Sequence, residues 1–229
     1  MAEIRVFGVN GVKLVMPDLI RAFERDSSHK VSLALDEAGH LRRRIVAGEA
    51  FDLAILPRPA ADALAAEGKL APGRTRDLVR AEFGCGVRGG TPQPGAALDA
   101  FRAFLLAARK IVYTDPATGG VSGVFFARLV DELGIAAQVA GRGQLTAGVL
   151  NAGPVARGEA DIAVQMKHEL LAVPGIDFVP FPPPYRDSGF VVFSAGPSLS
   201  ASSPAGELLE FLAGATAAGR FRARGLDSV

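Results

Sequence analysis

Short apolar runs alternate along the chain with longer stretches whose apolar residues recur at helical spacing, and this alternation limits the possible folds more than any other feature. The runs that predict strands are Ile4–Val9, Val31–Leu35, Leu53–Leu56, Ile111–Tyr113, Ile162–Val164 and Phe190–Phe193. Apolar helix faces are predicted from Leu19, Ile20 and Phe23, from Leu41 and Ile45, and from Val124, Phe125, Leu129, Val130 and Leu133. Strands that alternate with helices are typical of an α/β fold with mainly parallel sheets.

Composition narrows the classes of function. The chain has 229 residues, of which 49% are apolar, enough for one large domain or two smaller lobes. Lys and Arg number 25 against 24 for Asp and Glu, so the balance favours neither nucleic acid nor an anionic membrane surface as a partner. Cys85 is the single cysteine, which excludes an intramolecular disulfide. His29, His40 and His168 lack metal-ligand spacing, so we expect no metal and no cofactor.

The first residues bear on localisation. Glu3 and Arg5 interrupt what would be the apolar region of a signal peptide. No run approaches the roughly 20 apolar residues of a membrane span, so membrane insertion is not expected. The chain as given is predicted to be soluble and, if Met1 is natural, cytoplasmic. A periplasmic protein whose export signal had been removed would have the same sequence.

One internal recurrence concerns domain organisation. Residues 46–56 return in similar form as residues 155–165, which aligns Asp52 with Asp161 at the head of two apolar strands. A single recurrence near half the chain length suggests two similarly built lobes, whereas a solenoid repeats every ~20–50 residues. The alternative is that junctions of helix, glycine and strand simply resemble one another.

Two stretches rich in Gly and Pro mark where the chain would cross between lobes, near residues 80–88 and 182–190. They predict a discontinuous first lobe, residues 1–83 plus 186–229, and an inserted second lobe, residues 84–185. Ligands of open α/β sheets bind beyond the carboxyl ends of the strands, so two such lobes would form a cleft.

The strongest local signal for a site is the segment 114–123, which follows a predicted strand and opens a helix. Its glycines allow backbone N–H groups to approach an anion, and Thr118 and Ser122 add hydroxyl donors. The alternative is a Ser/Thr helix cap with a flexible loop. The segment matches neither nucleotide-binding glycine motif, which disfavours a nucleotide. With three similar junctions, the candidate ligand-binding residues are Asn10, Gly11, Ala38, Gly39, Thr118, Gly119, Ser122 and Asn151.

No catalytic triad can be assembled from the sequence. The titratable residues near the candidate loops are Glu37, His40, Tyr113, Lys167 and His168, and the sequence does not rank them. His29 lies in a polar run and is expected to be exposed. Arg42–Arg44 is interpreted as a solvated helix face or, alternatively, as a rim that attracts anions.

Several segments together resemble the molybdate-binding class of periplasmic solute-binding proteins. They are Ile4–Gly8, Phe23–Val31, Ala50–Leu56, Asp115–Gly123, Gly158–Val164 and Phe211–Leu226, and they extend over nearly the whole chain. The resemblance implies the type II periplasmic-binding-protein fold, in which two α/β lobes joined by two crossings close on a small anion. It also implies an ABC permease as partner if the chain is exported.

The expected site departs from that family's pattern. Asn10 stands where the family usually has Ser, and the acidic Asp36 and Glu37 occupy a second loop in which the family has Ser. Gln165 stands where Tyr is common, which makes Gln165 a further ligand-binding candidate. Carboxylates facing a compact dianion would repel it, so we expect an organic polycarboxylate to bind better than molybdate. The resemblance also extends to the aconitate isomerases. The sequence therefore leaves two functions open, a binding module and an isomerase that shifts a double bond by acid/base proton transfer.

Overall fold

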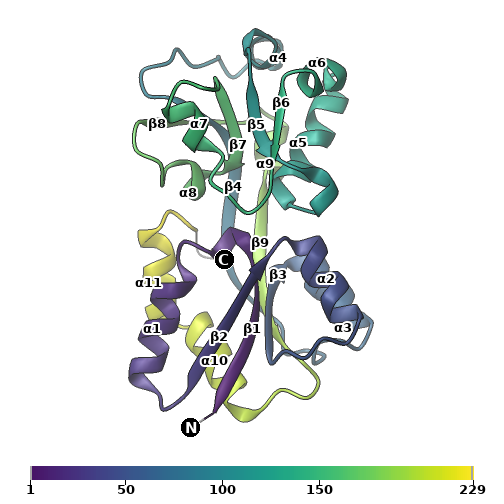
Figure 1. The fold of residues 1–229 in the computed structure, drawn as a ribbon, viewed down its shortest axis with the longest axis vertical. Helices are drawn as coiled ribbons and strands as arrows, with labels where there is room; N and C mark the ends of the chain where they lie inside the picture. Colours follow the sequence, from purple (N-terminus) through teal and green to yellow (C-terminus); the bar gives the residue numbers. More distant parts are fainter. Residues whose placement is uncertain (1, 228) are drawn as a thin grey trace. The chain divides into compact units, whose positions relative to one another are not determined.

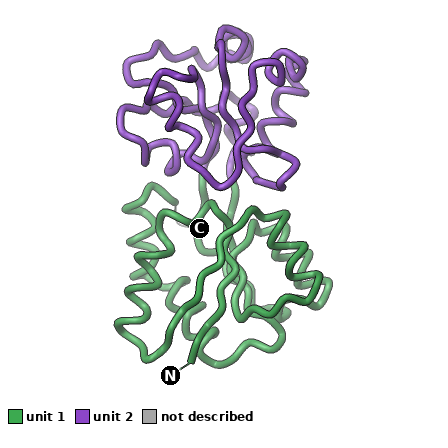
Figure 2. Tube along the Cα trace, viewed as in Figure 1, with its two compact units in different colours: residues 1–81, 191–229 green, residues 82–190 purple. Residues whose placement is uncertain are grey.

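The structure is a computed structural model that describes residues 2–227 and 229. The chain forms two compact units, which Figure 2 shows in different colours: unit 1 comprises residues 1–81 and 191–229, and unit 2 comprises residues 82–190. Two strands, β4 (Arg76–Arg88) and β9 (Phe190–Pro197), contain the points where the chain passes from one unit into the other. The boundary expected at 83/84 lies within β4, and the boundary expected at 185/186 lies within α9 (Tyr185–Ser188), which precedes β9.

Unit 1 contains a sheet in which β1 (Glu3–Val9) lies between two parallel neighbours, β2 (Lys30–Asp36) and β3 (Leu53–Pro57). β9 pairs with β3 in the antiparallel direction. The helices are α1 (Met16–Asp26), α2 (Ala38–Val46), α3 (Arg58–Ala66), α10 (Ser203–Ala213) and α11 (Ala215–Ala223), with a short 3-10 turn, η1 (Asn10–Val12). Helices α1, α10 and α11 lie on one side of these strands, and α2 and α3 on the other (Figure 1).

Unit 2 is built around β5 (Ile111–Thr114), which pairs in parallel with both β6 (Gly143–Thr146) and β7 (Ile162–Met166). β4 runs antiparallel to β7 and to β8 (Ile176–Pro180). The helical segments are α4 (Leu98–Ala107), η2 (Pro116–Thr118), α5 (Val121–Glu132), α6 (Ala136–Ala140), α7 (Ala152–Ala156), α8 (Lys167–Leu170) and α9 (Tyr185–Ser188). No helix among the described residues is long and apolar enough to cross a bilayer.

The sheet of unit 2 has apolar side chains on both faces, as a sheet covered by helices on both sides requires. Val112 and Ala163 belong to a buried aliphatic cluster that also contains Val155 of α7 and Leu170 of α8. Elsewhere in the unit, the Phe125 ring lies 5.3 Å from the Phe83 ring and 5.6 Å from the Phe181 ring between centroids. Both groups are buried in the core, so the strands and helices around the candidate loops are held firmly.

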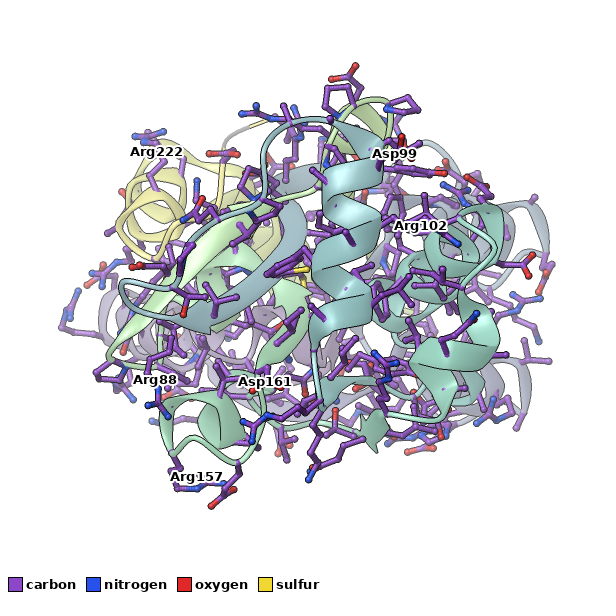
Figure 3. The ribbon with its side chains drawn as sticks, turned by 90° about the horizontal axis from the view of Figure 1, so that it is seen from above. Arg88, Asp99, Arg102, Arg157, Asp161 and Arg222 are labelled. Carbon is purple, nitrogen blue, oxygen red and sulfur yellow. The ribbon has the colours of Figure 1, made fainter. Side chains whose placement is uncertain are left out.

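The recurrence seen in the sequence corresponds to the same junction built once in each unit. Asp52 precedes β3 and accepts hydrogen bonds from the backbone N–H of Arg5 at 2.8 Å and from its Nε at 3.2 Å. Asp161 precedes β7 and accepts from the backbone N–H of Arg109 at 2.6 Å and from its Nη2 at 2.7 Å. Asp161 is labelled in Figure 3. Each aspartate thus ties the start of its strand to a neighbouring segment, which explains the repeated sequence by structure rather than by ligand binding.

Asp161→Asn should reduce the melting temperature by about 2–4 °C at neutral pH. The hydrogen bond from Arg109 lowers the pKa of the Asp161 carboxyl. A lowered folded-state pKa stabilises the fold above the ordinary aspartate pKa of about 4, and this contribution is lost as the pH falls through the lower value. Calorimetry from pH 7 to pH 3 should therefore show the difference between wild type and variant shrinking in acid. A difference that stays constant would contradict this role.

Two expectations about exposure are wrong. The side chain of His29 is only 15% exposed, because it stacks on Phe23 and its Nε2 lies 3.4 Å from Glu207 of α10, a helix distant in sequence. Val124 is 48% exposed, because the buried face of α5 passes through Phe125, Phe126 and Leu129 and turns Val124 outward. Pairing across the sheet also forms the long strand β4 and the short strands β6 and β8, none of which is among the strands predicted from the apolar runs.

Candidate functional site

The carboxyl ends of three parallel strands in unit 2 carry a group of polar side chains, here called the unit 2 polar cluster. Its members are Thr114 of β5, Thr146 of β6, Gln165 of β7, Ser122 of α5 and Asn151, which precedes α7. Thr114, Ser122, Asn151 and Gln165 are each at most 6% exposed. Buried polar groups are retained when they are hydrogen-bonded, so their partners decide what each side chain is free to do.

Asn151 is the centre of this cluster. It is fully buried, and its Nδ2 donates to the Val164 carbonyl oxygen at 2.9 Å and to Thr114 Oγ1 at 3.4 Å. Its Oδ1 accepts from the Thr146 hydroxyl at 2.6 Å. The amide of Asn151 therefore joins the ends of β5, β6 and β7, and its polar atoms are occupied within unit 2.

Gln165 fastens the loop before α7 to β7. Its Oε1 accepts from the backbone N–H of Asn151 at 2.9 Å, and its Nε2 donates to the Val149 carbonyl oxygen at 2.9 Å. Both ends of the amide are used in these bonds. These bonds shape the loop that surrounds the strand ends, and contact of Asn151 and Gln165 with the ligand stays a prediction.

The turn before α5 is also held by its own side chains. Asp115 accepts from the backbone N–H of Ala117 at 2.9 Å, and the Thr118 hydroxyl donates to the Asp115 carbonyl oxygen at 2.7 Å. Gly119 has a φ of 77°, a left-handed conformation that favours glycine. No side chain caps α5, whose N-cap residue is Gly120. This arrangement differs from the Ser/Thr helix cap considered as the alternative for this loop.

The first turn of α5 lies directly against the end of β5. A Cβ atom on Gly123 would lie 2.1 Å from the carbonyl oxygen of Thr114, a distance that no side chain tolerates. The first N–H groups of a helix lack partners within the helix and form an electropositive end. Glycine at position 123 therefore places those N–H groups beside the buried hydroxyls of Thr114 and Ser122, an arrangement suited to an oxyanion.

Unit 1 carries a second, titratable group at the carboxyl ends of β1 and β2, here called the unit 1 polar cluster: Asn10, Asp36, Glu37 and His40. Asn10 Nδ2 donates to Glu37 Oε1 at 3.1 Å. Asp36 Oδ1 accepts from the backbone N–H of Glu37 at 2.8 Å and lies 3.0 Å from His40 Nδ1. The Asp36 carboxylate thus orients the imidazole of His40, and a histidine oriented by a carboxylate is an arrangement used for proton transfer.

The other predicted residues lie in different settings. Gly11 is in η1, and Ala38 and Gly39 form the first turn of α2. Tyr113 packs against Phe126 with ring centroids 5.1 Å apart, and burial with the nearby Asp115 charge raises the pKa of its hydroxyl. Because successive strand residues face opposite ways, Tyr113 and Thr114 lie on opposite faces of β5.

The remaining titratable candidates are in α8. Lys167 Nζ lies 3.7 Å from Glu82 Oε2 and 5.4 Å from the Phe178 ring centroid. His168 is buried, at 4% exposed. Cys85 is buried in β4, and burial raises the pKa of its thiol, which makes it a poor nucleophile. Among residues 2–227 and 229, no three His, Cys, Asp or Glu side chains are grouped to hold a metal ion.

Sequence reasoning included Thr114 in the candidate segment 114–123 without singling it out as a ligand-binding residue, and it missed Thr146. The signal that was available is the alternation of side chains along a strand. Thr114 lies two residues after the core residue Val112, so both share one face of β5. β6 was not predicted, so nothing in the sequence paired Thr146 with Thr114.

The comparison with protein families decides the family. The model of the bacterial extracellular solute-binding proteins matches residues 4–227. The chain belongs to this family. An aconitate isomerase from Pseudomonas sp is 29% identical over 241 aligned positions, which cover all of this chain and 89% of that protein.

Solved structures of binding proteins are similar in fold. The periplasmic molybdate-binding protein of Azotobacter vinelandii superposes with a TM-score of 0.76 at 16% identity, covering 97% of this chain and 98% of that one. A periplasmic thiamin-binding protein gives a TM-score of 0.77 at 18% identity, with 99% and 83% covered. The type II periplasmic-binding-protein fold and the resemblance to molybdate-binding proteins are thereby confirmed. At these identities the likeness concerns the fold and not the ligand.

Proposed function

We propose that the protein is a solute-binding module for a small organic polycarboxylate. The observation that carries this proposal is the site in unit 2, where the start of α5 lies against the buried hydroxyls of Thr114 and Ser122. Unpaired N–H groups and hydroxyl donors favour an anion over a cation or a neutral ligand. An exported module of this family would deliver its ligand to an ABC permease.

A carboxylate is favoured over molybdate by the chemistry of the unit 1 polar cluster. Asn10 donates to Glu37 rather than standing free, and Asp36 adds a second acidic side chain close by. A compact dianion that approached the strand ends of unit 1 would be repelled by these two carboxylates, whereas a carboxylic acid with a hydroxyl or a transferable proton is compatible with them. The aconitate isomerase relative, similar over the whole chain, points to the same class of ligand.

Titration calorimetry with molybdate, sulfate, citrate, cis-aconitate and trans-aconitate tests the ligand class. We expect at least one tricarboxylate to bind at least about tenfold more tightly than molybdate, a difference of about 1.4 kcal/mol. Micromolar binding of molybdate, with no heat from any carboxylate, would overturn the proposal. Thermal shift with the same panel is an independent measurement, because a ligand that binds the folded state raises its stability.

The second candidate function is isomerisation of a small unsaturated polycarboxylic acid, and the pair of His40 and Asp36 favours it. Shifting a double bond requires a base that removes a proton from the carbon next to a carboxylate and an acid that returns a proton to another carbon of the allylic system. His40, oriented by Asp36, and Glu37, held by Asn10, are the groups in unit 1 that would exchange this proton.

His40→Asn should lower the rate of such an isomerisation by about 100-fold or more, since acid/base groups contribute about 10²–10⁴-fold. The assay follows the conversion between cis- and trans-aconitate by proton NMR in D2O, where exchange of the transferred proton with solvent labels the product. His29→Asn is a matched control, because His29 packs against Phe23 elsewhere in unit 1. Absence of conversion by the wild type at high enzyme concentration would remove the isomerase candidate.

A further inference from the structure

The two hydroxyls of Thr114 and Ser122 have more protons than the surrounding protein accepts. Thr114 Oγ1 and Ser122 Oγ lie 3.5 Å apart, and Thr114 Oγ1 also receives an N–H of Asn151 at 3.4 Å. Of the two hydroxyl protons, at most one is used between the pair. The hydrogen bonds of these two hydroxyls include no acceptor among the described residues for the second proton.

A buried donor without an acceptor is costly, so this second proton calls for a partner. Thr114 is 6% exposed and Ser122 is 3% exposed. Leaving a buried donor unpaired costs free energy comparable to a lost hydrogen bond, and proteins keep such groups where a ligand or a water completes them. The pair lies at the start of α5, where the helix end favours negative charge. Both features are satisfied by a negatively charged oxygen, which accepts a hydrogen bond and suits the helix end.

From this count we infer that the hydroxyl pair of Thr114 and Ser122 donates to an ionised oxygen of the ligand, an inference that rests on the proposed function. An ionised carboxylate oxygen accepts and does not donate, so it matches a site that offers only protons. Asn151 contributes indirectly, because its Nδ2 fills an acceptor position on Thr114 and leaves the Thr114 proton to be donated elsewhere. Thr118 is excluded from this role, because its hydroxyl already donates to the Asp115 carbonyl oxygen.

Four variants test this assignment when they are titrated with citrate and with trans-aconitate: Thr114→Val, Thr114→Ser, Ser122→Ala and Thr118→Val. Thr114→Val keeps the branched shape of a strand residue, so we expect the fold to persist and the dissociation constant to rise by about tenfold. Ser122→Ala should weaken binding by a similar factor. Thr114→Ser restores the hydroxyl and should stay within about threefold of wild type, as should Thr118→Val.

The outcomes separate this inference from the proposed function. If the wild type binds a tricarboxylate and both Thr114→Val and Ser122→Ala bind it equally well, the hydroxyl pair is overturned as the donor while the proposed function stands. If only Thr118→Val bound the tricarboxylate more weakly, the donor would lie in the turn before α5, and the assignment to the hydroxyl pair would also be overturned. If the wild type binds no anion of the panel, the proposed function and this inference fail together. Melting temperatures of all variants establish that each comparison is made on folded protein.

Discussion

Gly123→Ala should abolish measurable anion binding and reduce the stability of unit 2. The added Cβ would lie 2.1 Å from the carbonyl oxygen of Thr114 and 2.8 Å from its carbonyl carbon. Both are backbone atoms at the end of a paired strand, so the start of α5 must move away. Overpacking of this kind costs about 1–3 kcal/mol, and a chain of this size loses about 2–4 °C in melting temperature per kcal/mol. Moving the helix end also separates its N–H groups from the hydroxyl pair, which is why binding should fail together with stability.

Gly219→Ala is the matched control for this substitution. Gly219 lies inside α11, and a Cβ there would meet nothing within 4 Å. Replacing an unobstructed helical glycine by alanine should raise stability by about 0.5–1 kcal/mol. Calorimetric melting and citrate titration of both variants make the comparison. If Gly123→Ala melted and bound like the wild type, the close approach of α5 to β5 would not exist as described.

Asn151→Ala should reduce the free energy of unfolding by about 3–5 kcal/mol, a large effect for one substitution. The change removes the amide bonds to Val164, Thr114 and Thr146 at a fully buried position. Each buried group that loses its partner costs about 1–3 kcal/mol. The expected decrease can be measured by urea unfolding monitored by circular dichroism.

Gln138→Ala provides the reference for removing an amide without buried partners, because Gln138 is an exposed residue of α6. It should change stability by no more than about 0.5 kcal/mol. An Asn151→Ala variant as stable as Gln138→Ala would mean that the amide does not hold the three strand ends together. Such a result would also weaken the assignment of the Thr114 proton, since Asn151 fills an acceptor position on that hydroxyl.

The apolar pattern determined most of the framework. Each run predicted to be a strand is present, extended by a residue or more, because a run of buried branched residues needs sheet pairing and flanking helices to cover both faces. Gly48, which follows the last apolar residues of α2, has a φ of 84°, the left-handed conformation in which helices commonly end. The loops between strand and helix were also found from sequence, because Asn, Asp and Gly mark turns by their local conformational preferences.

The roles of the site residues depended on contacts that local sequence does not encode. The sequence marked Asn151 and Gln165 as polar loop and strand-end residues, but it did not show that their amides bond to Val164, Thr146 and Val149 within unit 2. Strand order brings these residues together, since β5 lies between β6 and β7 although β7 follows both in sequence. Sequence alone determined the six apolar strands and the polar loops that follow some of them, because those properties are local, whereas β4, β6 and β8 were not among the predicted strands. Only the tertiary structure decided which hydroxyl protons remain unused, because a hydrogen bond depends on partners brought together from distant parts of the chain.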